Sequence, residues 1–377
     1  MYIAELDRPW TDTPFVFQGF ILGSQAQLDA LKNYCSSVVV DFDRSETHDE
    51  SRAWKTAYPE KTSVEHEFQA ARAAMAGSES LMREMIASVR VGRTLDAERL
   101  RAAVTMMTEG VLRNPDALLL FSQLRDKGEY AVSHALDVAV YMIAFGRFLQ
   151  LEQGQIEFLG HLGLLQDIGK LRLPLELLEK RDRLSVEEFE RAKLHVSYSV
   201  EILRATPGLP RDLPRLAALH HERHNGSGYP KNLRGPEIGM IGSIAAIVDT
   251  FDALTVERPY AAAIGPSAAL NMLYKWRGVF FDAALVEQFI RCIGIFPVGS
   301  VVELNSGEVG LIIAQNPVKR LQPRVMVIRD AAGNPMRPHK LLDLSREPKI
   351  PAGDTYRIRR TLEYGRVPVS GEELFMK

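Results

Sequence analysis

The sequence is poor in cysteine and has no excess of charge of either sign. Its two cysteines, Cys35 and Cys292, stand far apart, which excludes a disulfide framework and a zinc site built from cysteine ligands. The 46 basic and 48 acidic residues leave a formal net charge of −2. This balance gives no electrostatic reason to expect binding to a nucleic-acid polymer or to a membrane surface.

Long hydrophobic runs are also missing. The longest, such as residues 239–248, stop at about ten residues, whereas a membrane span needs about 20. The first residues, MYIAELDRPWTD, include acidic side chains where a secretory signal needs a basic stretch and then an apolar one. We therefore expect a cytoplasmic protein without a membrane span. The length of 377 residues predicts two or three domains of ordinary globular composition.

Two kinds of segment make up the first third of the chain. Residues 1–43 mix β-strand patterns with one helical pattern and predict a small α+β domain. Residues 44–125 begin as a polar, aperiodic linker and continue as a long helical stretch, interrupted at Gly92 and near Pro115. We interpret this second segment as a linker and helical connector.

Helical periodicity dominates residues 126–296, and β-strand alternation follows in residues 297–377. Apolar residues recur in the first of these segments at helical spacing, for example at Val186, Phe189 and Val196, which predicts a helical bundle. In the second, two alternating runs flank an Asn-Ser-Gly turn and a third run follows, which predicts a small antiparallel β domain and a tail. The predicted fold class is mainly α, with the bundle between two small domains.

Histidine and aspartate residues are spread through the helical segment. Imidazole and carboxylate are the usual ligands of iron, manganese and zinc, and helices of one bundle can direct such side chains into a common core. A single histidine on a helix is more often a hydrogen-bonded packing residue, so these residues by themselves leave a metal site and ordinary packing equally open. The candidates are His134, Asp167, His195, His220, His221 and Asp249.

The phrases DIGK, HHERHNGSGYP and DTFDALTVERPY resemble, in order and spacing, the motifs of the HD-GYP domain. This is the bacterial branch of the HD metal-phosphohydrolases that cleaves the second messenger cyclic di-GMP. The resemblance covers about residues 130–294 and implies a helical fold with a centre of two or three metals, usually iron or manganese.

The N-terminal phrase MYIAELDRPW, followed by a Pro-Phe pair, resembles the small domain of unknown function that often precedes HD-GYP domains. In that family one further strand usually comes before this phrase. We therefore expect either that the start codon is misassigned or that this domain is truncated at its start.

The resemblance assigns roles to individual positions. Asp167 matches the aspartate that bridges the metals, and Lys170 of DIGK and Arg258 of RPY match the cations that hold the substrate phosphate. Tyr229 lies in the Gly-Tyr-Pro triplet, on a loop that contacts substrate or partner proteins in the family. The resemblance thus implies catalytic roles for Asp167 and Lys170 and substrate binding by Lys170, Arg258 and Tyr229. The implied metal ligands are His134, Asp167, His195, His220, His221 and Asp249.

Several positions depart from the family pattern. The histidine of the HD pair is Gln166, whose neutral amide oxygen is a weaker donor to a mid-row transition metal than imidazole. His161 is a poor replacement, because five residues along a helix place its side chain about 140° away. Tyr130 stands where three-metal members carry a glutamate, and Asn225 replaces an aspartate before the GYP triplet. We therefore expect two divalent metals, iron or manganese, with one position weakened, and a supporting role for Asp252.

Two functions of different classes remain open. The first is a cyclic di-GMP phosphodiesterase, in which the metals activate water and stabilise the leaving oxygen while Lys170 and Arg258 neutralise charge. The product is then a linear dinucleotide or GMP. Gln166 and Asn225 favour the second, a catalytically degenerate signalling protein that binds cyclic di-GMP or, through the GYP loop, a diguanylate cyclase of the GGDEF type. A phosphohydrolase for another nucleotide is a third option, and a homodimer is compatible with each.

Overall fold

The computed structural model divides the chain into two compact units, Met1–Thr56 and Ala57–Lys377. The residues it describes are 2–7, 20–22, 25–41, 57–125, 128–258, 262–351 and 353–362.

The first unit is a small antiparallel sheet with one helix. Its strands pair in the order β2-β1-β3, and Ile3, Phe20 and Leu31 form its buried core. The elements are β1 (Tyr2–Leu6), β2 (Phe20–Ile21), α1 (Gln25–Tyr34) and β3 (Val38–Asp41).

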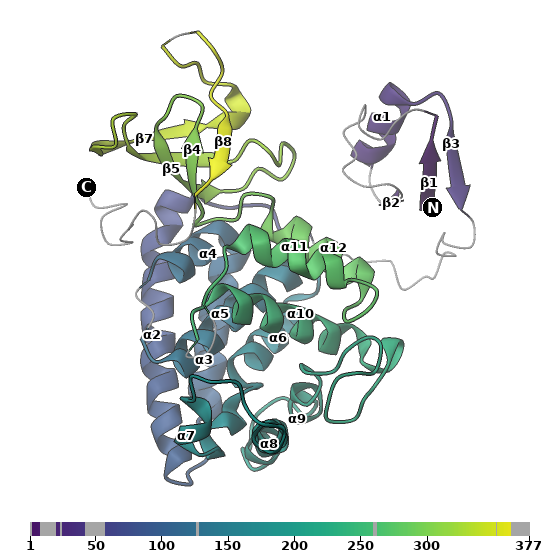
Figure 1. Ribbon diagram of the computed structural model, residues 1–377, viewed down its shortest axis with the longest axis vertical. Helices are drawn as coiled ribbons and strands as arrows, with labels where there is room; N and C mark the ends of the chain where they lie inside the picture. The colour runs from purple at the N-terminus through teal and green to yellow at the C-terminus, as the bar shows by residue number, and fades with distance from the viewer. Residues whose placement is uncertain are drawn as a thin grey trace. The chain divides into compact units, whose positions relative to one another are not determined.

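The second unit is a helical bundle followed by a five-stranded sheet (Figure 1). Its longer helices are α2 (Val64–Arg90), α3 (Ala97–Arg113), α4 (Pro115–Leu124), α5 (Tyr130–Phe148), α6 (Gln153–Leu165), α8 (Val186–Arg204), α10 (Gly239–Thr255), α11 (Pro266–Trp276) and α12 (Ala283–Ile293). Short helices lie between them, namely η3 (Ile168–Arg172), α7 (Leu175–Leu178), α9 (Leu213–Ala217) and η4 (Gly235–Glu237).

Local capping explains where the first helices begin and end. The Ser63 hydroxyl accepts a hydrogen bond from the His66 amide at the start of α2, and α2 ends before Gly92, as predicted. Asn114 ends α3, and its side chain accepts hydrogen bonds from the first amides of α4, whose first residue is Pro115. The two predicted interruptions of the helical stretch are therefore confirmed.

Helix α5 is the central helix of the bundle. By length and composition it is the one helix among the described residues that could cross a membrane, but 83% of its apolar window is buried inside the unit. Its side chains pack with those of α2, α3, α6 and α10 in one hydrophobic core. The apolar character of α5 is thus that of a core helix.

Gly163 lets α6 approach α5 closely. A Cβ atom at this position would lie 2.5 Å from the Cα atom of Ala139 on α5, closer than any real contact. This close approach matters for the site, because Gln166 and Asp167 follow directly after α6.

Replacing Gly163 with alanine is expected to lower the free energy of unfolding by about 1–3 kcal/mol, because the added methyl group must push two buried helices apart. Chemical denaturation measures this change. The matched control is Gly77→Ala on the exposed side of α2, where no atom lies within 4 Å of a new Cβ. That variant is expected to be neutral or more stable by up to about 1 kcal/mol. Equal stability of the two variants would contradict the close packing of α5 and α6.

The C-terminal sheet has the strand order β7-β6-β5-β4-β8 and is antiparallel throughout. The two strands around the Asn-Ser-Gly turn and the third strand were predicted, and they are confirmed as β4, β5 and β6. The sequence did not indicate the two edge strands, whose side chains are mostly polar or exposed. The strands are β4 (Val301–Leu304), β5 (Val309–Ala314), β6 (Arg324–Arg329), β7 (Pro335–Asp343) and β8 (Ile358–Thr361).

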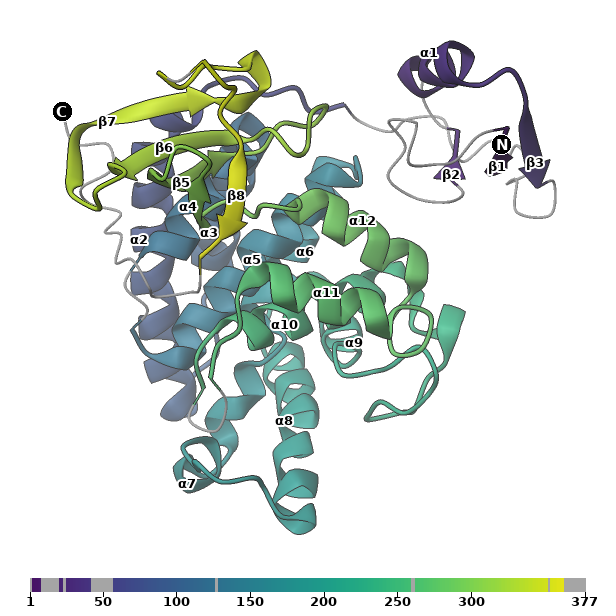
Figure 2. The ribbon, with the colours of Figure 1, turned by 45° about the horizontal axis from the view of Figure 1, so that its top comes forward.

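The predicted fold class, mainly α with small sheets at both ends of the chain, is confirmed. One predicted apolar helix face is only partly buried: Val196 is in the core, but Val186 and Phe189 are exposed. Helix α8 packs against η3 and α9. Val186 and Phe189 are exposed because the N-terminal part of α8 extends beyond the bundle (Figure 2). The domain boundaries at residues 43, 125 and 296 stay predictions.

Candidate metal centre

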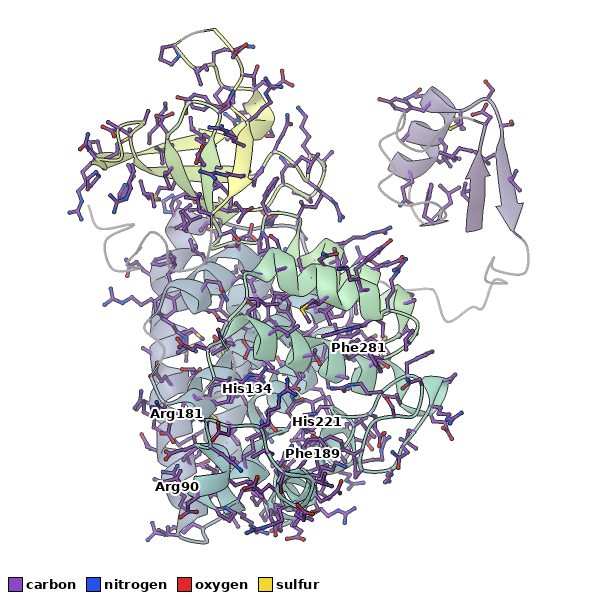
Figure 3. All side chains as sticks on the ribbon, in the orientation of Figure 1. Arg90, His134, Arg181, Phe189, His221 and Phe281 are labelled. Carbon is purple, nitrogen blue, oxygen red and sulfur yellow. The ribbon has the colours of Figure 1, made fainter. Side chains whose placement is uncertain are left out.

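Five separate segments carry polar side chains that meet at one place in the bundle. Figure 3 labels two of these side chains, His134 and His221. Helix α5 carries His134, the junction of α6 and η3 carries Gln166 and Asp167, and α8 carries His195. The segment after α9 carries His220 and His221, and α10 carries Asp249. All six of the candidate ligands lie in two groups that share one aspartate, namely Asp167, His195, His220 and His221 in the first group and His134, Asp167 and Asp249 in the second.

Close packing of η3 on α8 brings the first group together. The Gly169 amide donates a hydrogen bond to the Ser199 hydroxyl at 2.8 Å, and a Cβ at Gly169 would collide with the backbone of α8 at His195. Only glycine allows this approach, which sets Asp167 beside His195. Gly169, the glycine of the DIGK phrase, therefore helps to set the geometry of the site.

The imidazoles of the first group present unprotonated nitrogens to one another. The Nδ1 atoms of His195 and His220 face the carbonyl oxygens of Ala192 and Ala217 at 2.7 and 2.6 Å. A neutral imidazole has one N–H, and donation from Nδ1 leaves both Nε2 atoms with lone pairs, which face each other at 3.4 Å.

These lone pairs repel each other unless a cation lies between them. His221 Nε2 is 3.2 Å from His195 Nε2, and the Oδ1 atom of Asp167 is buried without a hydrogen-bond donor among the described residues. That oxygen lies 3.3 and 3.4 Å from the Nε2 atoms of His195 and His220. Three imidazole nitrogens and one carboxylate oxygen thus converge as a divalent transition metal requires.

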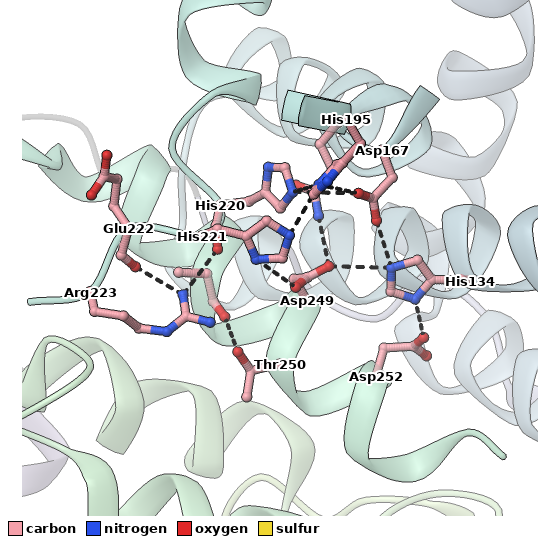
Figure 4. A network of polar contacts seen from close by, with 12 residues as sticks. His134, Asp167, His195, His220, His221, Glu222, Arg223, Asp249, Thr250 and Asp252 are labelled. Atoms are coloured by element: carbon pink, nitrogen blue, oxygen red, sulfur yellow. Dashed lines mark hydrogen bonds and ion pairs between the residues drawn. The ribbon is translucent and has the colours of Figure 1, made fainter. Parts of the chain in front are cut away.

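The second group uses the other oxygen of the same carboxylate (Figure 4). His134 Nε2 lies 3.1 Å from Asp167 Oδ2 and 3.2 Å from Asp249 Oδ1. On its other side, His134 Nδ1 is 2.6 Å from Asp252 Oδ2. A carboxylate behind a ligating histidine fixes the ring and its tautomer, so Asp252 has the supporting position predicted for it.

Gln166 takes part in the second group through its side chain. The amide is buried, and Nε2 donates a hydrogen bond to Asp249 Oδ1 at 3.2 Å. Its Oε1 atom has no hydrogen-bond donor among the described residues. His161 lies outside both groups, with its Nδ1 facing the Glu157 carbonyl oxygen at 2.8 Å. The structure therefore agrees that His161 does not replace the missing histidine.

Burial and neighbouring charges hold two of the ligands, His221 and Asp167, in states that suit a metal. Burial and the nearby His220 keep the pKa of His221 well below its usual value, so its imidazole is neutral. Burial raises the pKa of Asp167, but the charge of Lys170 opposes burial most strongly, and the pKa lies well below its usual value. Both side chains are therefore in the form that binds a cation.

The two predicted phosphate cations lie near the second group. The Lys170 ammonium donates to Asp167 Oδ2 at 2.7 Å, and its side chain is partly exposed. Tyr130 stacks on His134 with ring centroids 5.5 Å apart. Burial raises the pKa of Tyr130, and the charges of His134, Lys170 and Arg258 only partly offset this rise. Positive charge thus lies close to the Tyr130 ring.

The loop with the GYP triplet borders the first group. The Tyr229 ring stacks on His221 at 4.6 Å, and a Cβ at Gly228 would collide with the backbone at Glu222 and Arg223. The Asn225 side-chain oxygen accepts hydrogen bonds from the Ser227 amide and hydroxyl at 3.0 and 2.7 Å. Asn225 therefore shapes the loop and is not part of either ligand group.

Sequence reasoning missed Glu222 as a structural support of this loop. Its carboxylate is fully buried and accepts hydrogen bonds from the Lys231 amide at 2.7 Å and the Leu233 amide at 3.0 Å. A charged residue directly after two candidate ligands, His220 and His221, was the available signal. Buried carboxylates are found where backbone donors satisfy them.

Three family models match the chain. The HD domain matches residues 80–285, a domain of unknown function (DUF3391) matches residues 1–100, and the KOW domain associated with HD domain matches residues 301–351.

Curated relatives also match the chain. Cyclic di-GMP phosphodiesterase PA4108 of Pseudomonas aeruginosa is 30% identical over 95% of this chain and 88% of its own. The 3'3'-cGAMP-specific phosphodiesterase 3 of Vibrio cholerae is 35% identical over 45% of this chain and 37% of its own. Cyclic di-GMP phosphodiesterase response regulator RpfG of Xanthomonas campestris is 32% identical over 52% of this chain and 51% of its own. A solved structure of a HDG"Y"P protein from Bdellovibrio bacteriovorus, 15% identical, covers 74% of this chain and 83% of its own with a TM-score of 0.49.

Proposed function

The chain belongs to the HD domain family, in its HD-GYP branch, and from this premise we propose that it is a metal-dependent phosphodiesterase that hydrolyses cyclic di-GMP. The observation that carries the proposal is the position of Asp167. One oxygen of this carboxylate faces the three imidazoles of the first group, and the other faces His134 of the second. A two-metal site is one way to catalyse phosphodiester hydrolysis, and a carboxylate that faces two ligand groups suits such a site.

The chain's own residues have distinct tasks in this proposal. Divalent metals, when bound by the two groups, would activate the attacking water and stabilise the leaving oxygen. Asp252 accepts a hydrogen bond from His134 Nδ1. This bond fixes the ring so that its Nε2 atom faces the centre. Lys170 and Arg258 neutralise the charge of the phosphate, Lys170 as a point charge and Arg258 as a planar fork.

The substrate and the metals follow from different observations. We take cyclic di-GMP as substrate because the relative that matches 95% of the chain is named for it, although other relatives are named for cGAMP. Mixed imidazole and carboxylate donors suit iron or manganese. The proposed product is a linear dinucleotide or GMP.

Gln166 supports a second candidate function. Because this position offers an amide in place of an imidazole, the second group is expected to hold its metal weakly. A protein with one occupied position could bind cyclic di-GMP, or a GGDEF-type diguanylate cyclase at the GYP loop, and relay a signal with little turnover. In this case the Tyr229 loop is the proposed contact, and a homodimer is a further proposal.

Turnover of cyclic di-GMP by the full chain, purified without oxygen and loaded with iron or manganese, tests the proposed function. Chromatography of the products measures the rate. We expect a linear dinucleotide or GMP to accumulate. Binding without turnover would favour the signalling function, and neither binding nor turnover with either metal would contradict both.

Arg258→Ala is expected to weaken binding of a hydrolysis-resistant phosphorothioate analogue of cyclic di-GMP by about 10- to 100-fold, because a charge-assisted contact to phosphate is lost. Added salt is expected to weaken the wild-type affinity as well. Calorimetric titration measures both effects. The matched control is Arg99→Ala, which removes an exposed arginine that pairs with Glu84 on the surface. Equal affinities of wild type and Arg258→Ala would remove Arg258 from the substrate site.

A further inference from the structure

Phe189 is a large aromatic side chain that the fold leaves on the surface. It lies on α8, six residues before His195, and its exposed fraction is 45%. An exposed ring of this size gains free energy when a ligand covers it, since apolar area is then removed from water. No role in the metal centre or in the core accounts for Phe189.

Phe189 continues a series of rings that starts at the metal centre. The imidazole of His221 stacks with the Tyr229 ring at a centroid distance of 4.6 Å and an interplanar angle of 29°. The Tyr229 ring in turn meets Phe189 edge to face at 6.1 Å and 83°. Figure 3 labels Phe189 and His221, the two ends of this series of rings. The rings therefore lead outward from the ligands to solvent.

Lys193 contacts the rings of both Phe189 and Tyr229. The Lys193 ammonium lies 4.8 Å from the centroid of Phe189 and 5.4 Å from that of Tyr229, within the range of cation–π contacts. Its ion pair with Glu190, at 2.6 Å, holds it there. Tyr229 and Lys193 thus occupy two sides of Phe189, and the exposed part of the ring remains available to a ligand.

We propose that Phe189, braced by Tyr229 and Lys193, is a platform on which one purine base of the cyclic dinucleotide stacks. This inference rests on the proposed function and adds to it the part of the chain that recognises the base. In a cyclic dinucleotide a ribose connects each base to the phosphates, so a phosphate at the metal centre carries a base within reach of the surrounding surface. Aromatic side chains beside a phosphate site are the usual partners of such bases, because every base has a π-face.

The first test compares Phe189→Ala with Val186→Ala. Val186 is an apolar residue of the same helix, more exposed than Phe189, and none of the ring contacts involves it. Calorimetric titration with the phosphorothioate analogue of cyclic di-GMP is expected to show about 5- to 100-fold weaker binding for Phe189→Ala. Val186→Ala is expected to bind like wild type.

The second test detects stacking itself. Phe189→Trp is expected to restore the affinity, and the fluorescence of its indole is expected to be quenched by the analogue in a saturable way, after subtraction of the wild-type signal. Val186→Trp is the control and should show no such quenching. A loss of stability alone would not produce this signature.

The possible outcomes separate this proposal from the proposed function. Wild-type affinity in Phe189→Ala, or unquenched indole fluorescence in Phe189→Trp at saturation, would overturn the platform and leave the phosphodiesterase assignment in place. Failure of the wild-type protein both to bind the analogue and to cleave cyclic di-GMP would overturn the function and the platform together.

Discussion

Replacing His220 with alanine is expected to remove the tightly bound metal and to lower the rate of cyclic di-GMP hydrolysis by about 1,000-fold. His220 is fully buried, and its Nε2 atom faces both His195 Nε2 and Asp167 Oδ1. Without this imidazole the first group loses one of its four donors at a position that water reaches poorly. A metal ion contributes several kcal/mol to phosphoryl chemistry, which sets the size of the expected loss.

Elemental analysis and product chromatography on the same preparation measure both effects. The matched control is His161→Ala, which removes another buried histidine that lies outside both ligand groups. This control is expected to retain its metal, and thermal unfolding of both variants shows that the comparison is between folded proteins. Stoichiometric metal in the His220→Ala protein would contradict the first group as a metal site.

Exchanging Gln166 for histidine is expected to raise metal content and hydrolysis together, from about one metal per chain toward two and by about 10-fold or more in rate. The Gln166 side chain already reaches Asp249 Oδ1, and its own oxygen has no donor among the described residues. An imidazole at this position supplies a stronger ligand beside His134, Asp167 and Asp249. Changes in the groups that orient metal ligands commonly alter affinity 10- to 100-fold, which is about the effect expected here.

Gln166→Leu is the control for this gain. Leucine fills a similar volume but offers no donor atom, so neither metal content nor rate is expected to rise. If Gln166→His and Gln166→Leu behave alike, the second position does not depend on a ligand at residue 166. If both variants hold two metals per chain, His134, Asp167 and Asp249 are sufficient for the second metal, and if both hold one, residue 166 is not what limits the second position.

Most of the helical architecture could be predicted from the sequence, because local signals fixed it. The ends of the first helices depend on the Ser63 cap, Gly92 and the Asn114-Pro115 pair, which act through the backbone within one turn. Strands β7 and β8 were missed for the opposite reason. They are edge strands with few buried side chains, so the alternation that reveals a half-buried strand is weak in them.

The exposure of Phe189 shows that local sequence patterns are also limited in predicting which helical residues are buried. Apolar spacing along α8 indicates one apolar face, but spacing does not tell how far neighbouring elements extend along that face. In the structure α8 packs against η3 and α9, and on the same helix Val196 is buried while Phe189 stays exposed. Burial at a given position depends on contacts between distant segments.

By itself the sequence determined the helical class, the family resemblance and the identity of the ligand candidates, because motif order and residue chemistry are properties of the chain. It also identified Gln166 as the departure from the HD pair. The resemblance implied a shared Asp167, and the sequence predicted a supporting role for Asp252. Only the tertiary structure decided which oxygen of Asp167 faces each group, that His134 is the residue Asp252 supports, and that Glu222 holds the GYP loop. These relations join residues from different helices, and their distances depend on close approaches such as those at Gly163 and Gly169, which no local pattern encodes.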